Sequence, residues 1–237
     1  MLALYCNKPL EPRFLTDFRE LAEKGKVSKY ASKPGHKSGW GIVIYENEKP
    51  VYMGRYPTNA MNDPRYLEVC EQIEKMAFTG IALAHLRKAS HGEVSTANTH
   101  PFIYRNWIFA HNGSVEDLER PDPIPVEGDS DSERLFKHIM RRVVQGCECI
   151  QALKDIIYHV RTNHKFTSLT FIMSNGQSIY GYREFRREPE YYTLFFTRTD
   201  NAVIICQEPL WKLDWHEAKN RCLVVVDPNL EIKEINV

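Results

Sequence analysis

Three short stretches of the chain hold residue types that could do chemistry together. They are HLRKASHGEVSTANTHPF at 85–102, AHNGS at 110–114 and GDSDSE at 128–133. Between them they supply a guanidinium, imidazoles, hydroxyls, a side-chain amide and carboxylates. Such groups donate and accept hydrogen bonds or carry charge, so they could bind a small polar molecule and act on it.

Each stretch taken alone also has an ordinary structural interpretation. Asn112-Gly113 could be a hairpin turn. Asp131 stands before a helical pattern and could be its N-cap. Arg87 could be a surface residue at a strand end, and His100 could be a hydrogen-bonded core histidine. Only the combination of the three stretches therefore indicates a function.

The stretches occur along the chain in a recognisable order. The order H-x-R-x-A-[ST]-H-G, N-x-H-P, H-N-G and D-[ST]-E resembles the class II glutamine amidotransferases, a branch of the N-terminal-nucleophile hydrolases. HKSGWGI at 36–42 resembles the stand-alone branch of that family, which includes γ-glutamyl hydrolases of thiol metabolism. The resemblance covers roughly residues 1–210.

The resemblance implies how the amino-acid end of a glutamine would be held. Arg87 would hold the α-carboxylate, because a guanidinium fork pairs both oxygens at once. Asp131 would take the α-ammonium, while Ser90 and His91 would line the pocket with hydroxyl and backbone groups. The substrate would be a small molecule, glutamine or a γ-glutamyl compound, and we expect no cofactor and no metal.

The resemblance also implies an oxyanion hole for the amide that is cleaved. Asn112 would offer its side-chain NH₂ and Gly113 its backbone N–H to the tetrahedral oxyanion. Glycine at this place lets the backbone come close to the substrate. We interpret His100 and His111 as structural neighbours rather than acid–base groups, and Trp40 as either a pocket wall or a residue of the layer interface.

The nucleophile of the family is a cysteine at the mature N-terminus, whose own α-amine serves as the base. The chain begins MLALYCNKP, and no cysteine follows Met1. Alignment on the family pattern places Met1 inside the first strand, two positions after the nucleophile. We therefore expect the natural chain to begin Met-Cys-Arg. Cys6 would lie farther along that strand, and we interpret it as a core thiol.

Apolar periodicity predicts the elements that must position these residues. Amphipathic helices are indicated at 12–25, 64–77, 131–146 and 150–162, and strands at 1–6, 35–45, 50–56, 81–89 and 106–113. Residues 168–237 are rich in strands, with hairpin turns expected at Asn175-Gly176 and Asp200-Asn201. The pattern predicts an α+β fold of four layers, αββα, with two antiparallel sheets between helix layers. We expect residues 1–237 to form a single glutamine amidotransferase type 2 domain.

Composition excludes several other classes of function. The 31 basic and 31 acidic residues leave a formal net charge of zero, which gives no electrostatic case for a nucleic-acid or membrane partner. The six cysteines form no C-x-x-C pair and no metal-ligand spacing, so we expect free thiols. With no apolar run of spanning length and no signal-peptide pattern, a cytoplasmic protein is expected.

Two classes of function remain open from the sequence. The first is an amide hydrolase acting on glutamine or a γ-glutamyl amide, with any synthase that accepts ammonia being a separate protein. The alternative is a non-catalytic glutamine-binding or γ-glutamyl-binding module, a pseudoenzyme, which would fit a chain without the N-terminal cysteine. A hydrolase using an internal cysteine with a histidine has no recognisable motif here. We expect the loop at 182–192 to rim the site.

Overall fold

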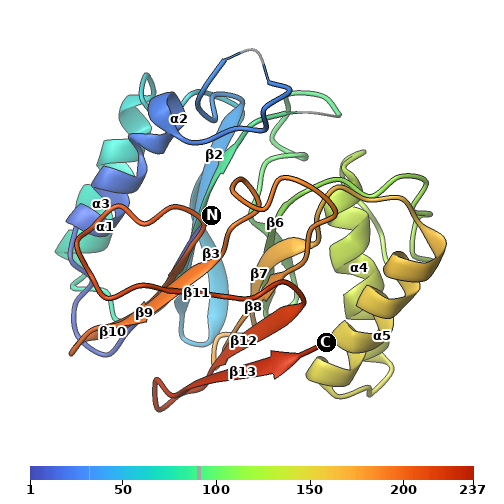
Figure 1. The fold of residues 1–237 in the computed structure, drawn as a ribbon. Coiled ribbons are helices and arrows are strands. Elements are labelled where there is room, and N and C mark those ends of the chain that lie inside the picture. Colours follow the sequence, from blue (N-terminus) through green and yellow to red (C-terminus); the bar gives the residue numbers. More distant parts are fainter. Residues whose placement is uncertain (32, 90–91) are drawn as a thin grey trace.

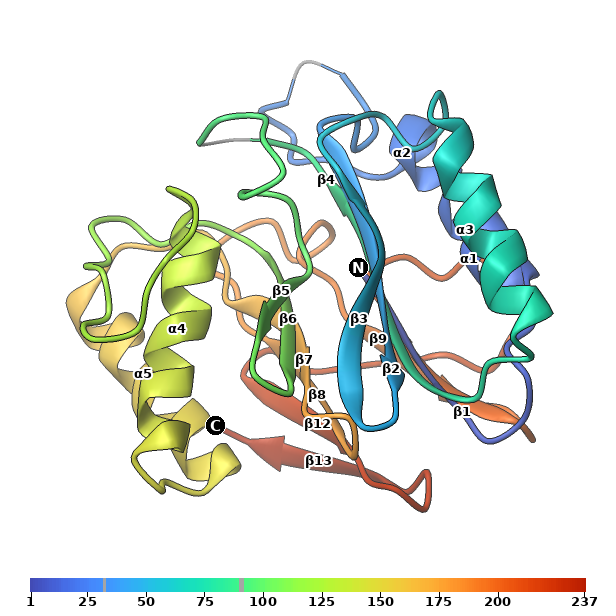
Figure 2. The same cartoon turned by 180° about the vertical axis from the view of Figure 1, so that it is seen from behind.

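The structure is a computed structural model that describes residues 1–31, 33–89 and 92–237. Two β-sheets face each other in the middle of the molecule, with helices on both outer sides (Figure 1). Figure 2 shows the same sandwich from behind, with α3 outside one sheet and α4 and α5 outside the other. This is the four-layer αββα arrangement expected from the sequence.

The first sheet holds the N-terminal strand near its centre. Its strand order is β11-β9-β10-β1-β4-β2-β3, and every pair is antiparallel. The strands are β1 (Leu2–Cys6), β2 (Gly39–Glu46), β3 (Lys49–Tyr56), β4 (Gly80–Arg87), β9 (Phe195–Arg198), β10 (Ala202–Cys206) and β11 (His216–Glu217).

The second sheet comes mostly from the C-terminal half of the chain. Its order is β13-β12-β8-β7-β6-β5, again antiparallel throughout. The strands are β5 (Phe102–Tyr104), β6 (Trp107–Asn112), β7 (Thr170–Ser174), β8 (Ile179–Arg183), β12 (Cys222–Val226) and β13 (Ile232–Asn236).

The helices form two separate outer layers. The longer helices begin at side chains that accept a hydrogen bond from the first turn, namely Asp63, Ser130 and Glu148. One layer is α1 (Arg13–Phe18), α2 (Leu21–Lys24) and α3 (Pro64–Lys75), and the other is α4 (Asp131–Val144) and α5 (Cys149–Asn163). No helix within the described ranges is long and apolar enough to cross a membrane.

Three apolar clusters fill the spaces between the layers. Strand alternation explains the division, because successive side chains of a strand point to opposite faces. Leu2 and Leu4 join the cluster under α1 and α3, whereas Met1 and Ala3 join the cluster between the sheets. The third cluster lies between the second sheet and α4 and α5. Both sheets are thus covered on both faces, which is why central strands such as β1, β7 and β10 are apolar almost throughout.

The structure confirms most of the expected elements and corrects two details. Asn175-Gly176 and Asp200-Asn201 lie in the β7–β8 and β9–β10 hairpins. The helix expected at 12–25 is divided into α1 and α2, because backbone bonds of the i→i+3 type run through residues 17–23. Asp131 is not an N-cap, because Ser130 takes that position.

Two residues singled out in the sequence belong to the core. Trp40 is fully buried under α3, packs edge-to-face against Tyr66, and donates from Nε1 to Asp63 at 3.0 Å, so it is an interface residue and not a pocket wall. Cys6 is 4% exposed and packs in the cluster under the helices. Burial raises the pKa of the Cys6 thiol to about 12, which disfavours the reactive thiolate.

Candidate active site

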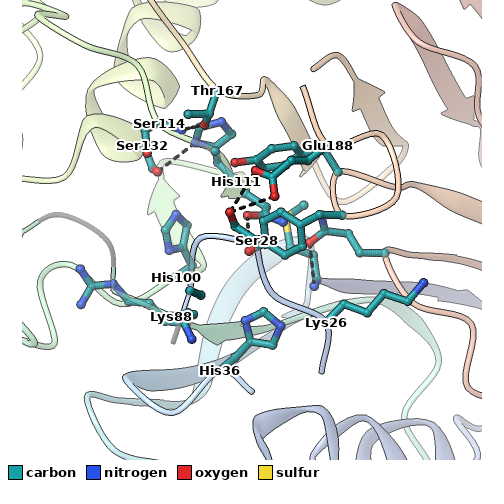
Figure 3. A pocket seen from close by; sticks show the side chains of 18 of the residues that line it. Lys26, Ser28, His36, Lys88, His100, His111, Ser114, Ser132, Thr167 and Glu188 are labelled. Carbon is teal, nitrogen blue, oxygen red and sulfur yellow. Dashed lines mark hydrogen bonds between the residues drawn. The ribbon is translucent and has the colours of Figure 1, made fainter. Parts of the chain in front are cut away.

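A cavity of about 870 Å³ opens at one end of the space between the two sheets. The first sheet contributes Met1 and the end of β4, and the second sheet contributes the end of β6. The start of α4 and the loops at 26–36 and 186–192 complete the wall. Figure 3 shows side chains from these elements around the cavity. Its size is typical of small-molecule sites.

Strand alternation aims two of the predicted site residues into this space. On β4, Ile81 and Leu83 face the second sheet, so Arg87 shares their face. On β6, Ile108 and Ala110 face the first sheet, and Asn112 shares theirs. Both strands end at the cavity, so the guanidinium and the amide line it from opposite sheets.

Arg87 is held at the end of β4 with little access to solvent. It is 5% exposed, and its Nη1 donates to the carbonyl oxygen of Glu93 at 2.9 Å. Burial lowers the pKa of the Arg87 guanidinium, while the nearby charges of Asp129 and Asp131 act in the opposite direction. A buried, oriented guanidinium of this kind suits a carboxylate ligand.

Asp131 is the first residue of α4 and lines the same cavity. Ser130 caps the helix by accepting from the backbone N–H of Ser132, which fixes the point where the helix begins. One carboxylate oxygen of Asp131 accepts from the backbone N–H of Val115 at 2.6 Å. The carboxylate is thereby tied to the segment that follows Asn112 and Gly113.

Asn112 and Gly113 stand at the end of β6, and their geometry is not that of a hairpin turn, since β6 and β7 are joined by a long connection. The Oδ1 of Asn112 accepts from the Tyr191 hydroxyl at 3.4 Å, which leaves its NH₂ as the donor. A Cβ on Gly113 would lie 2.1 Å from the carbonyl oxygen of Ser168, so only glycine fits.

Three buried histidines stand at the inner end of the cavity. His111 donates from Nε2 to the carbonyl oxygen of Ser168 at 3.0 Å, so its Nδ1 accepts from the Ser132 hydroxyl at 2.9 Å. The rings of His85 and His100 stack with centroids 4.4 Å apart. Burial lowers the pKa of all three imidazoles, which keeps them neutral near pH 7. Both ring nitrogens of His111 thus have partners, whereas both ring nitrogens of His100 are without a hydrogen-bond partner among the described residues.

A contact between two loops was not evident from the sequence. The hydroxyl of Ser28 donates to the Glu188 carboxylate at 2.9 Å, and the backbone N–H of Lys29 donates to it at 2.8 Å (Figure 3). The pair joins residues 28–29 to the segment at 186–192, which lines the cavity. Of the loop expected at 182–192, residues 182–183 belong instead to β8, and 182–185 do not line the cavity. Ser90 and His91, the remaining predicted site residues, lie outside the described residues.

The start of β1 also reaches the cavity. The backbone nitrogen of Met1 lies 3.4 Å from Oε1 of Gln207, and both residues line the cavity wall. None of the six cysteines, all of which are described, is a lining residue. The cavity therefore combines a guanidinium, a carboxylate and a side-chain amide with a strand end, but no thiol.

A sandwich of two antiparallel sheets between helices, with this site at its open end, defines the N-terminal-nucleophile class of glutamine amidotransferase fold. The family model described as glutamine amidotransferases class-II matches residues 1–228. The chain belongs to this family.

Individual relatives support the same assignment. YafJ of Escherichia coli strain K12, which carries a provisional glutamine amidotransferase name, is 33% identical over 153 residues, or 61% of this chain and 55% of YafJ. The chain spans 55–61% of the length of three curated relatives that it matches over most of its own length.

Solved structures share the fold across the chain. The glutamine aminotransferase class-II domain protein of Silicibacter pomeroyi has a TM-score of 0.69 at 21% identity, covering 99% of this chain and 98% of that one. The phosphoribosylpyrophosphate amidotransferase of Bacillus subtilis has a TM-score of 0.65 at 17% identity, covering 99% of this chain and 48% of that one. At these identities the likeness concerns the fold.

Proposed function

We propose that the protein cleaves the side-chain amide of glutamine or of a γ-glutamyl compound. The observation that carries the proposal is the convergence of Arg87, Asp131, Asn112 and Gly113 on one cavity. These residues come from β4, α4 and the end of β6, and only the folded chain brings them together. We also propose that residues 1–237 act as one glutamine amidotransferase type 2 domain.

The proposed roles follow the chemistry of each group. Arg87 pairs the α-carboxylate of the substrate, and Asp131 pairs its α-ammonium. A thiolate attacks the γ-carbonyl carbon, forming a C–S bond and moving the carbonyl electron pair onto oxygen. The Asn112 NH₂ and the Gly113 N–H donate to that oxyanion. The oxyanion then re-forms the carbonyl as the C–N bond breaks, and the amine leaves with the proton taken from the thiol. Water adds to the thioester carbonyl and the C–S bond breaks, which releases glutamate and returns the thiol.

The proposal places the thiol on a cysteine N-terminal to Met1. Leu2 pairs with Ala84 in an antiparallel register, so a residue two positions before Met1 would stand opposite Arg87. Its side chain would share the face of Met1, which points into the space between the sheets. That is the face from which Arg87 and Asn112 line the cavity. The α-amine of such a cysteine would take the thiol proton.

The test compares three chains in one assay of glutamate release, from glutamine and from γ-glutamyl dipeptides. They are the 237-residue chain, the same chain preceded by Met-Cys-Arg, and the chain preceded by Met-Ser-Arg as a matched control. We expect activity in the cysteine-bearing chain alone. The preferred substrate then separates a γ-glutamyl hydrolase from a glutaminase whose ammonia passes to a separate synthase protein.

A non-catalytic binding module is the second candidate, because no cysteine lines the cavity. It predicts that all three chains release no glutamate, yet bind glutamine in calorimetry, and that Arg87→Ala removes the binding. Absence of both activity and binding in all three chains would contradict both candidates.

A further inference from the structure

The charges around the cavity are unbalanced, although the whole chain has a formal net charge of zero. Of the described lining residues, six are basic and three are acidic. The basic ones are Lys26, Arg87, Lys88, Lys165, Arg186 and Arg187, and the acidic ones are Asp131, Glu188 and Glu208. Such an excess of one sign in a concave surface attracts ligands of the opposite sign.

The acidic side chains are engaged within the wall itself. Each accepts a hydrogen bond from a backbone N–H, Asp131 from Val115, Glu188 from Lys29 and Glu208 from Lys26. Within the part of the chain that the structure describes, no carboxylate forms an ion pair with Lys165, Arg186 or Arg187. Arg186 donates from Nη2 to the backbone carbonyl oxygen of Arg161 at 3.1 Å, which is an uncharged acceptor, so all three side chains keep their positive charge.

The three cations belong to two neighbouring segments at the mouth of the cavity. The backbone N–H of Arg186 donates to the carbonyl oxygen of Thr167 at 3.0 Å, which sets the segments side by side. The Arg186 guanidinium lies 4.3 Å from the centre of the Phe166 ring, so it is held over an aromatic face. Lys165 and Arg187, which are next to Phe166 and Arg186 in the sequence, are exposed and also line the cavity.

Cations also line the opposite side. Figure 3 shows Lys26, His36 and Lys88 on the side of the cavity away from Thr167. Lys88 Nζ donates to the backbone carbonyl oxygen of Lys33 at 2.6 Å, which holds its charge near the mouth. An anionic group in the outer half of the cavity would thus meet positive charge on two sides.

We propose that the amide donor carries a second acidic group on its amine side, and that Lys165, Arg186 and Arg187 bind it. This inference rests on the proposed function, in which Arg87 and Asp131 hold the glutamyl head. The amine side then extends toward the mouth, and a cavity of about 870 Å³ has room for it. The chemical class is a γ-glutamyl amide of an amino acid or short peptide with a free carboxylate.

The test uses a matched pair of ligands that differ in one charge. γ-Glutamylglycine carries the second carboxylate, and γ-glutamylglycinamide has a neutral amide in its place. Calorimetric titration of the 237-residue chain measures both, with glutamine as the reference ligand. We expect the acid to bind about three- to tenfold more tightly than the amide, and the ratio to fall at high ionic strength.

Charge reversal assigns the preference to residues. In the double variant Lys165→Glu/Arg187→Glu we expect the ratio to fall to about one or to invert. Lys75→Glu is the matched control, because Lys75 is an exposed lysine on α3 paired with Glu71 and is not a lining residue. It should keep the ratio of the unaltered chain.

The outcomes separate this inference from the proposed function. If glutamine and both γ-glutamyl ligands fail to bind, the proposed function and the inference both fail. If glutamine binds but the acid and the amide bind equally, the inference alone is wrong. A preference that survives the double variant would equally overturn the assignment to these residues.

Discussion

The side-chain amide of Asn112 is held in one orientation at this site. An amide presents an acceptor at one end and a donor at the other, and an oxyanion hole needs the donor end. The Tyr191 hydroxyl occupies the acceptor end at 3.4 Å. Burial raises the pKa of Tyr191, so its hydroxyl stays protonated and can donate. Tyr191 is thus a positioning residue for Asn112.

Removal of the Asn112 donor should slow catalysis more than it weakens binding. In the cysteine-bearing chain, Asn112→Ala and the isosteric Asn112→Asp should each lower kcat by about 10²–10³-fold, with a much smaller change in KM. Steady-state glutamate release measures both constants. Asn163→Ala, at the exposed end of α5, is the control. A rise in KM of the same size, with kcat unchanged, would show that Asn112 only binds substrate.

The buried histidines should make the fold sensitive to acid. The folded-state pKa values of His85, His100 and His111 lie below the ordinary value of about 6.5, chiefly because of burial. Below pH of about 6.5 the unfolded chain binds more protons than the folded one, so stability falls as the pH falls. Each histidine contributes a slope of about 1.4 kcal/mol per pH unit until its folded pKa is reached.

Urea unfolding between pH of about 7.5 and about 5 measures that slope. His100→Gln should lower the slope of the free energy of unfolding against pH by about 1.4 kcal/mol per pH unit, because one buried imidazole no longer titrates. Asn163→Ala, at an exposed residue of α5 without a titratable group, is the control and should leave the slope unchanged. A free energy of unfolding that stays constant over this range would show that the imidazoles are accessible to protons in the folded protein.

At the scale of elements, Asn98 connects the two proposed head-binding residues, Arg87 at the end of β4 and Asp131 at the start of α4, through their neighbours. It is 2% exposed, and its Oδ1 accepts from the backbone N–H groups of Asp129 and Ser130, directly before α4. Its Nδ2 donates to the carbonyl oxygen of Glu93 at 3.2 Å. The same carbonyl accepts from Arg87. Asn98 therefore links the Glu93 carbonyl, which also accepts from Arg87, to the start of α4.

Substitution of Asn98 should weaken ligand binding without touching the ligand. Asn98→Ala leaves two backbone N–H groups without their acceptor, and Asn98→Asp removes the donor to Glu93. We expect the Kd for glutamine to rise about tenfold or more in both variants. Calorimetry gives the Kd, and thermal unfolding shows whether the variants are folded. Folded variants with unchanged affinity would refute this role.

At the scale of the molecule, the apolar layer between the two sheets sets the distance across the cavity. Arg87 belongs to one sheet and Asn112 to the other, so contacts between the sheets keep the proposed clamp opposite the proposed oxyanion hole. Ile172 on β7 is 1% exposed and belongs to this layer. The site therefore depends on packing well away from its own residues.

A cavity in that layer should lower the free energy of unfolding. Ile172→Ala should lower the free energy of unfolding by about 2–5 kcal/mol, because the sheets can close the gap only in part. Tyr158→Ala is the control, since Tyr158 is 66% exposed on α5 and should change stability by no more than about 0.5 kcal/mol. Urea unfolding measures both, and a loss for Ile172→Ala no larger than the control's would mean that the layer can repack.

The sequence by itself determined the elements and the family. Apolar strands flanked by amphipathic helices predict covered sheets, and the glycine and asparagine turns place the hairpins, because these are local properties of the backbone. The order of motifs also predicted Arg87, Asp131, Asn112 and Gly113 as site residues, and the folded chain brings all four to one cavity. Local patterns failed at the N-cap, where Ser130 and not Asp131 takes the position.

Only the tertiary structure decided which groups surround the proposed site residues. Tyr191 reaches Asn112 across 79 positions, and Ser28 reaches Glu188 across 160. The cationic mouth likewise unites segments from different parts of a chain without net charge. Such contacts depend on how two sheets stack and where their connecting loops meet, which no local propensity encodes.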